Sequence, residues 1–212
     1  LNNSFNFKNK GITVLDTIVT VLMCIVLVLA VSRVVFSLMY FKVYVIGASM
    51  SGTIEGAAGE NVSGGEYVYA CRRNTPVRGD IIIIDTHKNV GTDTKNIIKR
   101  VIALGGDKVA LKEGVLYLNG EIKEESYILP EHNTPSAPQN SFDEIEVPKG
   151  YMFCMGDNRN NSTDSRSQLY GCMPVSWTEG IVADWSLFLK KPITDFNTYF
   201  DFTLPKSFGV KK

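Results

Sequence analysis

The stretch Gly156-Asp-Asn-Arg-Asn-Asn-Ser162-Thr-Asp164-Ser-Arg166 is almost entirely polar, and apolar segments lie on both sides of it. We call residues 156–166 the polar loop. Polar side chains are buried only when they are hydrogen-bonded. The polar loop is therefore either a solvated turn or an internally bonded network that lines a site. Two motifs upstream favour the second interpretation.

The first motif is Gly47-Ala-Ser49-Met50, which follows the alternating, β-branched segment 42–47. That segment predicts a strand with Ser49 just past its end. The second motif is Ile97-Ile-Lys99-Arg100-Val101, where a lysine interrupts a run typical of a buried strand. Because side chains alternate along a strand, Lys99 shares a face with Ile97 and Val101, and Arg100 points to the other face.

A serine hydroxyl becomes a good nucleophile only when a base takes its proton. A lysine serves as that base only as a free amine, so burial has to lower its pKa from the usual value of about 10.4. Lys99 is predicted to be buried in this way, although an ion pair with Asp157 is an alternative. His87 and His132 lie in polar or proline-rich segments and are predicted to be surface residues. These residues together predict a hydrolase that uses serine and lysine without histidine.

These three segments and Arg78-Gly79-Asp80-Ile81, in order over about residues 12 to 185, resemble the sequence boxes of bacterial type I signal peptidases. Members of that family are membrane-anchored Ser/Lys proteases that remove signal peptides. The resemblance implies that Ser49 is the acylating nucleophile and Lys99 the general base. It also implies that Ser162 hydrogen-bonds and orients the lysine amine. The remaining support would come from the Asp164–Arg166 pair and from Gly156, Asp157, Asn158 and Arg159, which hold the loop.

The chain departs from the family pattern at two positions near the nucleophile. Some members have a serine where this chain has Gly47, so the N–H of Ser49 would need a backbone group or water as the second oxyanion donor. The family string Ser-Met-x-Pro-Thr reads Ser49-Met50-Ser51-Gly52-Thr53 here. Glycine can adopt the φ of proline without being held there, so we expect a looser turn at Met50 and the substrate cleft, without loss of activity.

The N-terminal region is apolar, and Asp16 and Arg33 are its only charged residues between Ile12 and Phe41. A spanning helix needs about 20 mostly apolar residues, so we predict one transmembrane helix over 13–34. A cleavable signal peptide ending near Ala30 is the alternative. Flanking lysines and arginines do not decide the orientation. The resemblance implies a cytoplasmic segment 1–12 and a catalytic domain on the extracytoplasmic face of the cell membrane.

The rest of the chain predicts a mainly β domain without helical periodicity. Short strands are expected near 66–70, 80–85, 97–104 and 151–155, with a closing strand over 180–189. Asn119-Gly120 is the strongest hairpin signal, and the proline-rich excursion 123–149 breaks regular structure. The resemblance implies a β-rich core formed by residues 35–111 and 148–212, with a small inserted β lobe over 112–147.

Composition excludes several classes of protein. The 22 basic and 22 acidic residues give zero net charge, which argues against nucleic-acid binding. The cysteine and histidine spacings show no metal pattern, so no metal or cofactor is expected. Cys24 lies in the predicted span. Of the remaining three cysteines, buried thiols are expected, with Cys154–Cys172 as the candidate bridge.

The resemblance implies that the partners are secreted preproteins and the lipid bilayer, and we expect a monomer. Two other functions are open. One is a noncatalytic membrane adaptor or assembly chaperone, which only Gly52 supports. The other is a self-cleaving repressor-type Ser/Lys protease, against which stand the apolar span, the lack of a DNA-binding segment and the intact polar loop.

Overall fold

The computed structural model describes residues 5–59, 64–73, 75–86 and 96–199, with side chains from residue 13 onward. The chain forms two compact units, Leu1–Tyr40 and Phe41–Lys212. Helix α1 (Phe5–Met39) makes up nearly all of the first unit.

Helix α1 is long and apolar enough to cross a membrane, with a mean hydropathy of 2.8 in an 18-residue window of its 27-residue stretch Thr13–Met39. At a rise of 1.5 Å per residue this stretch is about 40 Å long, which exceeds a hydrocarbon core of about 30 Å. Thr17 and Thr20 donate their hydroxyl hydrogens to carbonyls one turn back, so these two hydroxyls do not require water. The predicted apolar helix is confirmed, and it continues past residue 34 because Val34–Met39 contains no helix-breaking residue.

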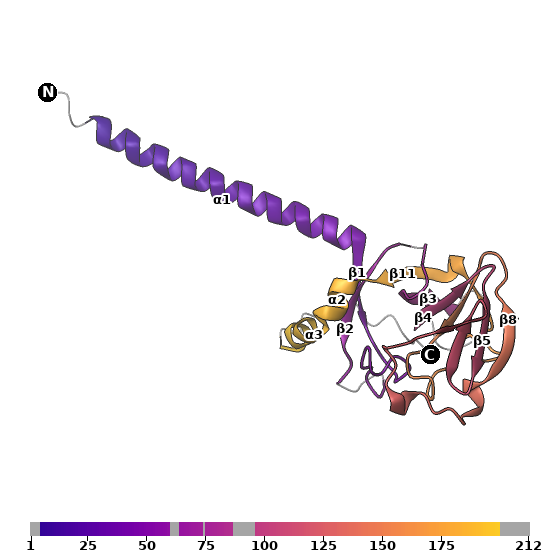
Figure 1. The fold of residues 1–212 in the computed structure, drawn as a ribbon. Helices are drawn as coiled ribbons and strands as arrows, with labels where there is room; N and C mark the ends of the chain where they lie inside the picture. The colour runs from indigo at the N-terminus through magenta and orange to yellow at the C-terminus, as the bar shows by residue number, and fades with distance from the viewer. Residues whose placement is uncertain (1–4, 60–63, 74, 87–95, 200–212) are drawn as a thin grey trace. The chain divides into compact units, whose positions relative to one another are not determined.

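The second unit is built on a seven-stranded sheet with the order β1-β2-β11-β3-β4-β9-β10 (Figure 1). Its strands are β1 (Tyr40–Tyr44), β2 (Tyr67–Cys71), β3 (Ile81–Asp85), β4 (Asn96–Leu104), β9 (Tyr151–Met155), β10 (Met173–Pro174) and β11 (Thr178–Val182). Strand β3 is covered on both faces: Ile81 and Ile83 pack into one apolar cluster, Ile82 and Ile84 into another. This arrangement explains why β3 is an unbroken apolar run instead of an alternating one.

Strand β4 changes partners along its length. It pairs with β3 from Asn96 to Arg100, whereas its pairing with β9 begins only at Arg100 opposite Met155. Its first residues therefore have no strand on the β9 side in the part of the chain that the structure describes. Lys99 lies where the second pairing starts.

A second sheet of four strands follows β4, with the order β7-β6-β5-β8. It comprises β5 (Lys108–Lys112), β6 (Val115–Leu118), β7 (Glu121–Lys123) and β8 (Phe142–Glu146). We call residues 108–147 the lobe. Its sheet begins at Lys108, ahead of the boundary predicted at 112. Asn119 and Gly120 have φ values of 56° and 83°, which confirms the predicted hairpin.

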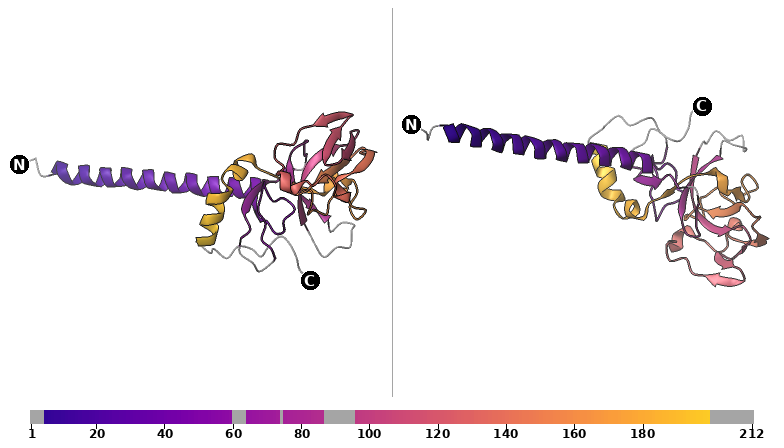
Figure 2. Two further views of the ribbon diagram at one scale, coloured as in Figure 1. Left: turned by 60° about the horizontal axis from the view of Figure 1, so that its bottom comes forward. Right: turned by 90° about the horizontal axis from the view of Figure 1, so that it is seen from above.

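The lobe and the first sheet share one apolar cluster. Val109, Leu111 and Leu116 of the lobe pack with Phe153 and Met155 of β9, and Figure 2 shows the arrangement from two further sides. The long connection from β7 to β8 contains two single turns of 3₁₀ helix, η2 (Pro130–His132) and η3 (Pro138–Asn140). The excursion over 123–149 therefore belongs to a folded lobe.

Two predictions about the C-terminal part are wrong. Strand β11 ends at Val182, before the expected end at 189. Two helices follow it, α2 (Asp184–Phe188) and α3 (Lys190–Tyr199), although no helix was expected in the domain. A 3₁₀ turn, η4 (Val175–Trp177), precedes β11. Helix α3 joins the sheet through polar side chains: the Thr194 Oγ1 accepts from the Tyr67 N–H at 2.8 Å, and Lys190 pairs with Glu66. No residue of α3 is buried, so the helix lacks the buried apolar face on which a prediction from the sequence relies.

Cys154 and Cys172 are both free thiols, so the candidate bridge between them is not formed. Cys24 and Cys71 are free as well. Burial raises the pKa of the Cys154 thiol, so this group stays protonated and apolar at neutral pH.

Candidate active site

Ser49 lies in a loop that leaves β1, and we call residues 47–57 the nucleophile loop. Gly47 has a φ of +85°, and its N–H donates to the Ala57 carbonyl at 2.8 Å. Met50 and Ile54 have no exposed surface and anchor the loop in the core of the first sheet. The turn from Gly47 to Met50 thus holds the Ser49 side chain in one place, while Gly47 itself has no free N–H to offer.

The Lys99 amine donates a hydrogen bond of 2.9 Å to the Ser49 hydroxyl. A second bond of 2.9 Å goes to the carbonyl of Ile98. Lys99 is 4% exposed, and burial lowers its pKa from 10.5 to about 8, with the charge of Asp164 partly opposing the shift. A substantial share of the amines is therefore neutral near pH 8, and such an amine can accept the proton of Ser49.

Arg100, the next residue of β4, points to the opposite face and binds the carboxylate of Asp157. Its Nε and Nη2 atoms donate to the Asp157 carboxylate at 2.8 and 2.6 Å. Lys99 has no hydrogen bond to Asp157 among the described residues, so the alternative of a Lys99–Asp157 pair is not realised. A buried amine without an acid of its own loses its proton more easily.

Gly156 is where the polar loop approaches the nucleophile. A Cβ atom at this position would lie 2.4 Å from the Ser49 carbonyl oxygen and 2.4 Å from the Ser162 hydroxyl. The Ser49 carbonyl accepts the N–H of Asn158 at 3.0 Å, and the Gly156 N–H donates to Asp164 at 2.9 Å. Only glycine allows the two loops to come this close.

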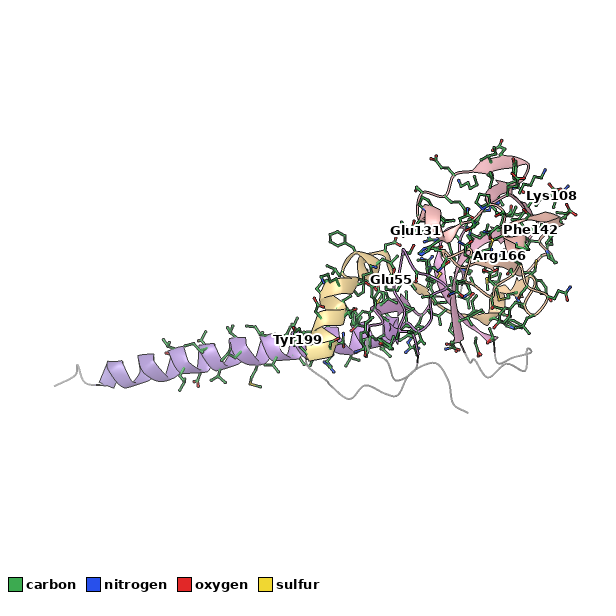
Figure 3. The ribbon with its side chains drawn as sticks, turned by 90° about the horizontal axis from the view of Figure 1, so that it is seen from below. Glu55, Lys108, Glu131, Phe142, Arg166 and Tyr199 are labelled. Atoms are coloured by element: carbon green, nitrogen blue, oxygen red, sulfur yellow. The ribbon has the colours of Figure 1, made fainter. Side chains whose placement is uncertain are left out.

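Asp164 and Arg166 form the buried pair predicted for them. Two guanidinium nitrogens of Arg166 donate to the Asp164 carboxylate at 2.9 and 2.8 Å. Burial alone would raise the pKa of Asp164, but these bonds, the Arg166 charge and the N–H of Gly156 outweigh it and hold the pKa below its usual value. Arg166 also donates to Asn140 of the lobe at 2.8 Å, and Figure 3 labels Arg166 together with Lys108 and Phe142 of the lobe.

Ser162 does not make the contact that the resemblance implies. Its hydroxyl is buried, and within the described residues it makes no hydrogen bond of normal geometry, to Lys99 or to any other group. It is nevertheless close enough to Asp164 to help lower the pKa of that carboxylate. The lysine amine is instead oriented by Ser49 and the Ile98 carbonyl.

The expectation for Gly52 is also wrong. Its φ is +94°, which proline cannot adopt, so Gly52 does not imitate a proline turn. Its N–H donates to the Glu55 carboxylate at 2.8 Å, a bond that proline would lose. The side chains of Leu129 and His132 fill the space that a side chain at position 52 would need.

His132 is therefore half-buried against the nucleophile loop and is not a surface residue. The segment that carries it includes Glu131, which Figure 3 labels together with Glu55 of the nucleophile loop. His87 lies outside the described residues.

Several residues of the site were not predicted. The Thr53 hydroxyl donates to Asp157 at 2.6 Å, and Glu125 accepts two hydrogen bonds from Arg159, which has no exposed surface. A buried arginine requires an acidic partner, so an arginine that is expected to be buried predicts an acid beside it. The lobe offers at least six acids, however, so the sequence does not show which one is used. Among the described residues, no group of three His, Cys, Asp or Glu side chains could hold a metal ion.

Comparison with known proteins agrees with this geometry. Residues 14–185 match the family model described as signal peptidase, peptidase S26. The chain is 33% identical to signal peptidase I of Bacillus licheniformis over 169 residues, which cover 76% of this chain and 82% of that protein. It is 31% identical to signal peptidase I P of Bacillus subtilis subsp. natto over 168 residues, 76% of this chain and 83% of that protein.

A crystal structure of a signal peptidase I from Enterococcus faecalis V583 aligns with a TM-score of 0.42 and 29% identity, covering 51% of this chain and 97% of that chain. The β-rich domain and the family match define a peptidase. More specifically, the chain belongs to the S26 family of signal peptidases, with signal peptidase I among its relatives.

Proposed function

We propose that this protein is a membrane-anchored serine endopeptidase that removes signal peptides from secreted preproteins with Ser49 and Lys99. The observation that carries the proposal is the 2.9 Å hydrogen bond between the Ser49 hydroxyl and an almost fully buried lysine amine. Membership of the signal peptidase family supports the substrate class.

In the proposed reaction the neutral Lys99 amine takes the Ser49 proton as Oγ attacks the carbonyl carbon of the scissile bond. The resulting ammonium gives that proton to the leaving nitrogen as the C–N bond breaks, which leaves an acyl ester on Ser49. The amine then takes a proton from the water that attacks the ester, and Ser49 regains its proton when the ester breaks. A pKa of about 8 suits both roles, because either protonation state is accessible near neutral pH.

The developing oxyanion needs donors that are already in place. The Ser49 N–H is unbonded within the described part of the chain and is the proposed first donor. The Gly47 N–H is occupied by Ala57, so the second donor is another backbone group or a water molecule.

The substrate would bind by adding a strand to the edge of β4. Residues 96–98 of β4 have no partner on the β9 side among the described strands, and Ile97 there is only partly buried. An extended peptide can pair with such an edge. Paired along it, the peptide would run toward Lys99 and Ser49. As in the family that the chain resembles, shallow apolar pockets would accept small residues before the cleaved bond.

Helix α1 is the proposed anchor. Its span suits the cell membrane, and we propose that the catalytic domain lies on the extracytoplasmic face, where exported preproteins emerge. The proposed partners are these preproteins and the lipid bilayer, and the proposed state is a monomer.

The test is cleavage of a preprotein in detergent by the intact chain, by Ser49→Ala and by Lys99→Met. We expect the intact chain to release the signal peptide and both variants to lose at least about 10³-fold in rate. Equal rates for all three would refute the roles of Ser49 and Lys99. A complete lack of cleavage by the intact chain would favour the adaptor, although an assembled Ser49–Lys99 hydrogen bond is not expected in an adaptor.

A further inference from the structure

The polar loop is tied to the lobe by a fully buried ion pair. Arg159 has no exposed surface, and its Nη1 and Nη2 atoms donate to Glu125 at 2.8 and 2.5 Å. The Glu125 side chain is 8% exposed and lies two residues after the end of β7. The Nε atom of Arg159 donates to the Gly156 carbonyl at 3.2 Å. Glu125 of the lobe thus holds Arg159, and Arg159 in turn bonds Gly156, which packs closely against Ser49.

Tyr127, two residues further along the lobe, extends this network to β4. Its hydroxyl donates to Glu125, and its ring covers the Arg100 guanidinium at 3.9 Å from the ring centre. Burial and the Glu125 charge raise the pKa of Tyr127, so its hydroxyl remains a donor at any working pH. The two lobe residues therefore contact both buried arginines.

Asp157 connects the network to both halves of the catalytic pair. It accepts from Arg100, which follows Lys99 in β4, and from Thr53, which lies in the nucleophile loop. Its side chain is 1% exposed and has no room to move into water. Any shift of Asp157 would change the spacing between the strand of the base and the loop of the nucleophile.

We propose that Glu125 and Tyr127 of the lobe are positioning residues that set the distance between Ser49 and Lys99. They act through Arg159, Arg100 and Asp157 and touch neither the substrate nor the reacting atoms. This inference rests on the proposed function. It gives the lobe an indirect role in catalysis, because Glu125 and the Tyr127 ring hold the guanidinium groups of Arg159 and Arg100 in place.

The physical reason is the cost of an unpaired buried charge. Without the Glu125 carboxylate the Arg159 guanidinium moves toward solvent, since a buried charge without a partner is strongly unfavourable. Its bond to Gly156 moves with it, and Gly156 has no free space toward Ser49 or Ser162. A misplacement of about 1 Å between reacting groups can cost about 10²-fold in rate.

The test measures kcat, KM and melting temperature of the full-length chain in detergent for four variants. Glu125→Gln keeps the shape of the side chain and removes its charge, and we expect kcat to fall about 10- to 100-fold while KM stays within about twofold. Tyr127→Leu removes the ring over Arg100 and should lower kcat about 10-fold. Tyr127→Phe keeps the ring and should recover most of that loss. Glu144→Gln, which removes an exposed ion pair of the lobe, is the matched control and should leave kcat unchanged.

A double variant, Glu125→Leu with Arg159→Met, separates positioning from stability. Replacing both partners of a buried ion pair by apolar residues is often neutral for stability. We expect its melting temperature to return toward that of the intact chain while kcat stays low. Recovery of kcat together with the melting temperature would show that the pair acts only through stability and would overturn the inference.

The inference and the proposed function fail in different ways. Normal kcat in Glu125→Gln and Tyr127→Leu, with Ser49→Ala inactive, would reject the positioning role and leave the peptidase intact. An intact chain that cleaves no preprotein would reject both. A rise in KM without a fall in kcat would place Glu125 in substrate binding and would also contradict the inference.

Discussion

Two buried basic side chains of one domain, Lys99 and Arg159, have partners of opposite kinds, uncharged for Lys99 and charged for Arg159. Arg159 is completely enclosed and receives a carboxylate from Glu125. Lys99 is almost as enclosed, but its hydrogen bonds go to a hydroxyl and a carbonyl, which carry no charge. The nearest acids are engaged elsewhere, Asp157 by Arg100 and Asp164 by Arg166.

The difference shows how one domain makes either a fixed cation or a base from buried nitrogen groups. Burial always disfavours the charged form, and a paired acid cancels the effect. Where the acid is withheld, the pKa falls to about 8 and the amine can exchange protons. The four predictions below test this contrast, from the largest expected effect to the smallest.

Lys99→Arg should break the contrast by placing a permanent cation in the pocket that lacks an acid. A guanidinium keeps its proton in proteins, so no base would remain and cleavage should fall at least about 10³-fold. Initial rates on a preprotein measure this effect. Lys108→Arg, at a half-exposed position, should cleave normally. Substantial cleavage by Lys99→Arg would mean that another group takes the Ser49 proton.

Lys99→Met should reveal the energetic cost of the buried amine. The pKa of Lys99 is lower in the folded state than the ordinary value of 10.5, so between pH 8 and 10.5 the unfolded state binds more protons and stability rises with pH. Below pH 8 the full cost is present, about 3 kcal/mol at 1.36 kcal/mol per pH unit, or roughly 100-fold in the unfolding equilibrium.

Denaturant unfolding at pH 7 and pH 10 measures this cost. Lys99→Met should be more stable than the intact chain at pH 7, and the advantage should shrink at pH 10. Arg159→Met should show no such trend relative to the intact chain, because both proteins keep the Lys99 amine. A constant difference between Lys99→Met and the intact chain would contradict the lowered pKa.

Gly156→Ala tests the residue that connects the two cations: Gly156 accepts a hydrogen bond from Arg159 and packs against Ser49, the partner of Lys99. The added Cβ would overlap the Ser49 carbonyl and the Ser162 hydroxyl, so we expect kcat to fall by some tens of fold. Gly150→Ala is the matched control, since Gly150 has a φ of +80° and open space around it. The control should lose about 1 kcal/mol of stability and keep its kcat. Equal kcat values for the two variants would argue against a tight fit at Gly156.

Asp164→Asn should produce the smallest effect, a shift of the acidic limb of kcat/KM. Cleavage by the intact chain should rise through pH 8 as Lys99 loses its proton. The Asp164 charge raises the pKa of Lys99 and the Arg166 charge lowers it, so removing the carboxylate should move the limb to lower pH by less than one unit. Asp157→Asn should move it less. A shift to higher pH in Asp164→Asn would contradict this account.

Local patterns in the sequence suffice for the parts of the fold that local chemistry decides. The apolar run of β3, the lysine inside β4 and the Asn119-Gly120 turn each specify their own structure. Ser49 and Lys99 could be paired from the sequence because Lys99 interrupts a run typical of a buried strand and because the segments around both residues resemble those of signal peptidases.

Other features depend on partners far away in the chain and could not be predicted in the same way. The φ of Gly52 follows from the Glu55 carboxylate that its N–H meets and from Leu129 and His132, which lie over it. Helix α3 is attached through polar side chains and buries none of its residues, and ten residues are too few for a helical pattern to stand out in the sequence. Glu125 is one of several similar acids, and only the completed fold selects it for Arg159.

The bond between Thr53 and Asp157 joins positions 104 residues apart. A ribosome delivers the amino-terminal end first, so the serine emerges long before the segment that will hold it in register with its base. Until residues 156–166 have been synthesised, the Ser49 hydroxyl of the growing chain is not held in register with its base. We therefore expect the peptidase to be inactive until the polar loop has been synthesised, and a chain halted after β8 should cut nothing.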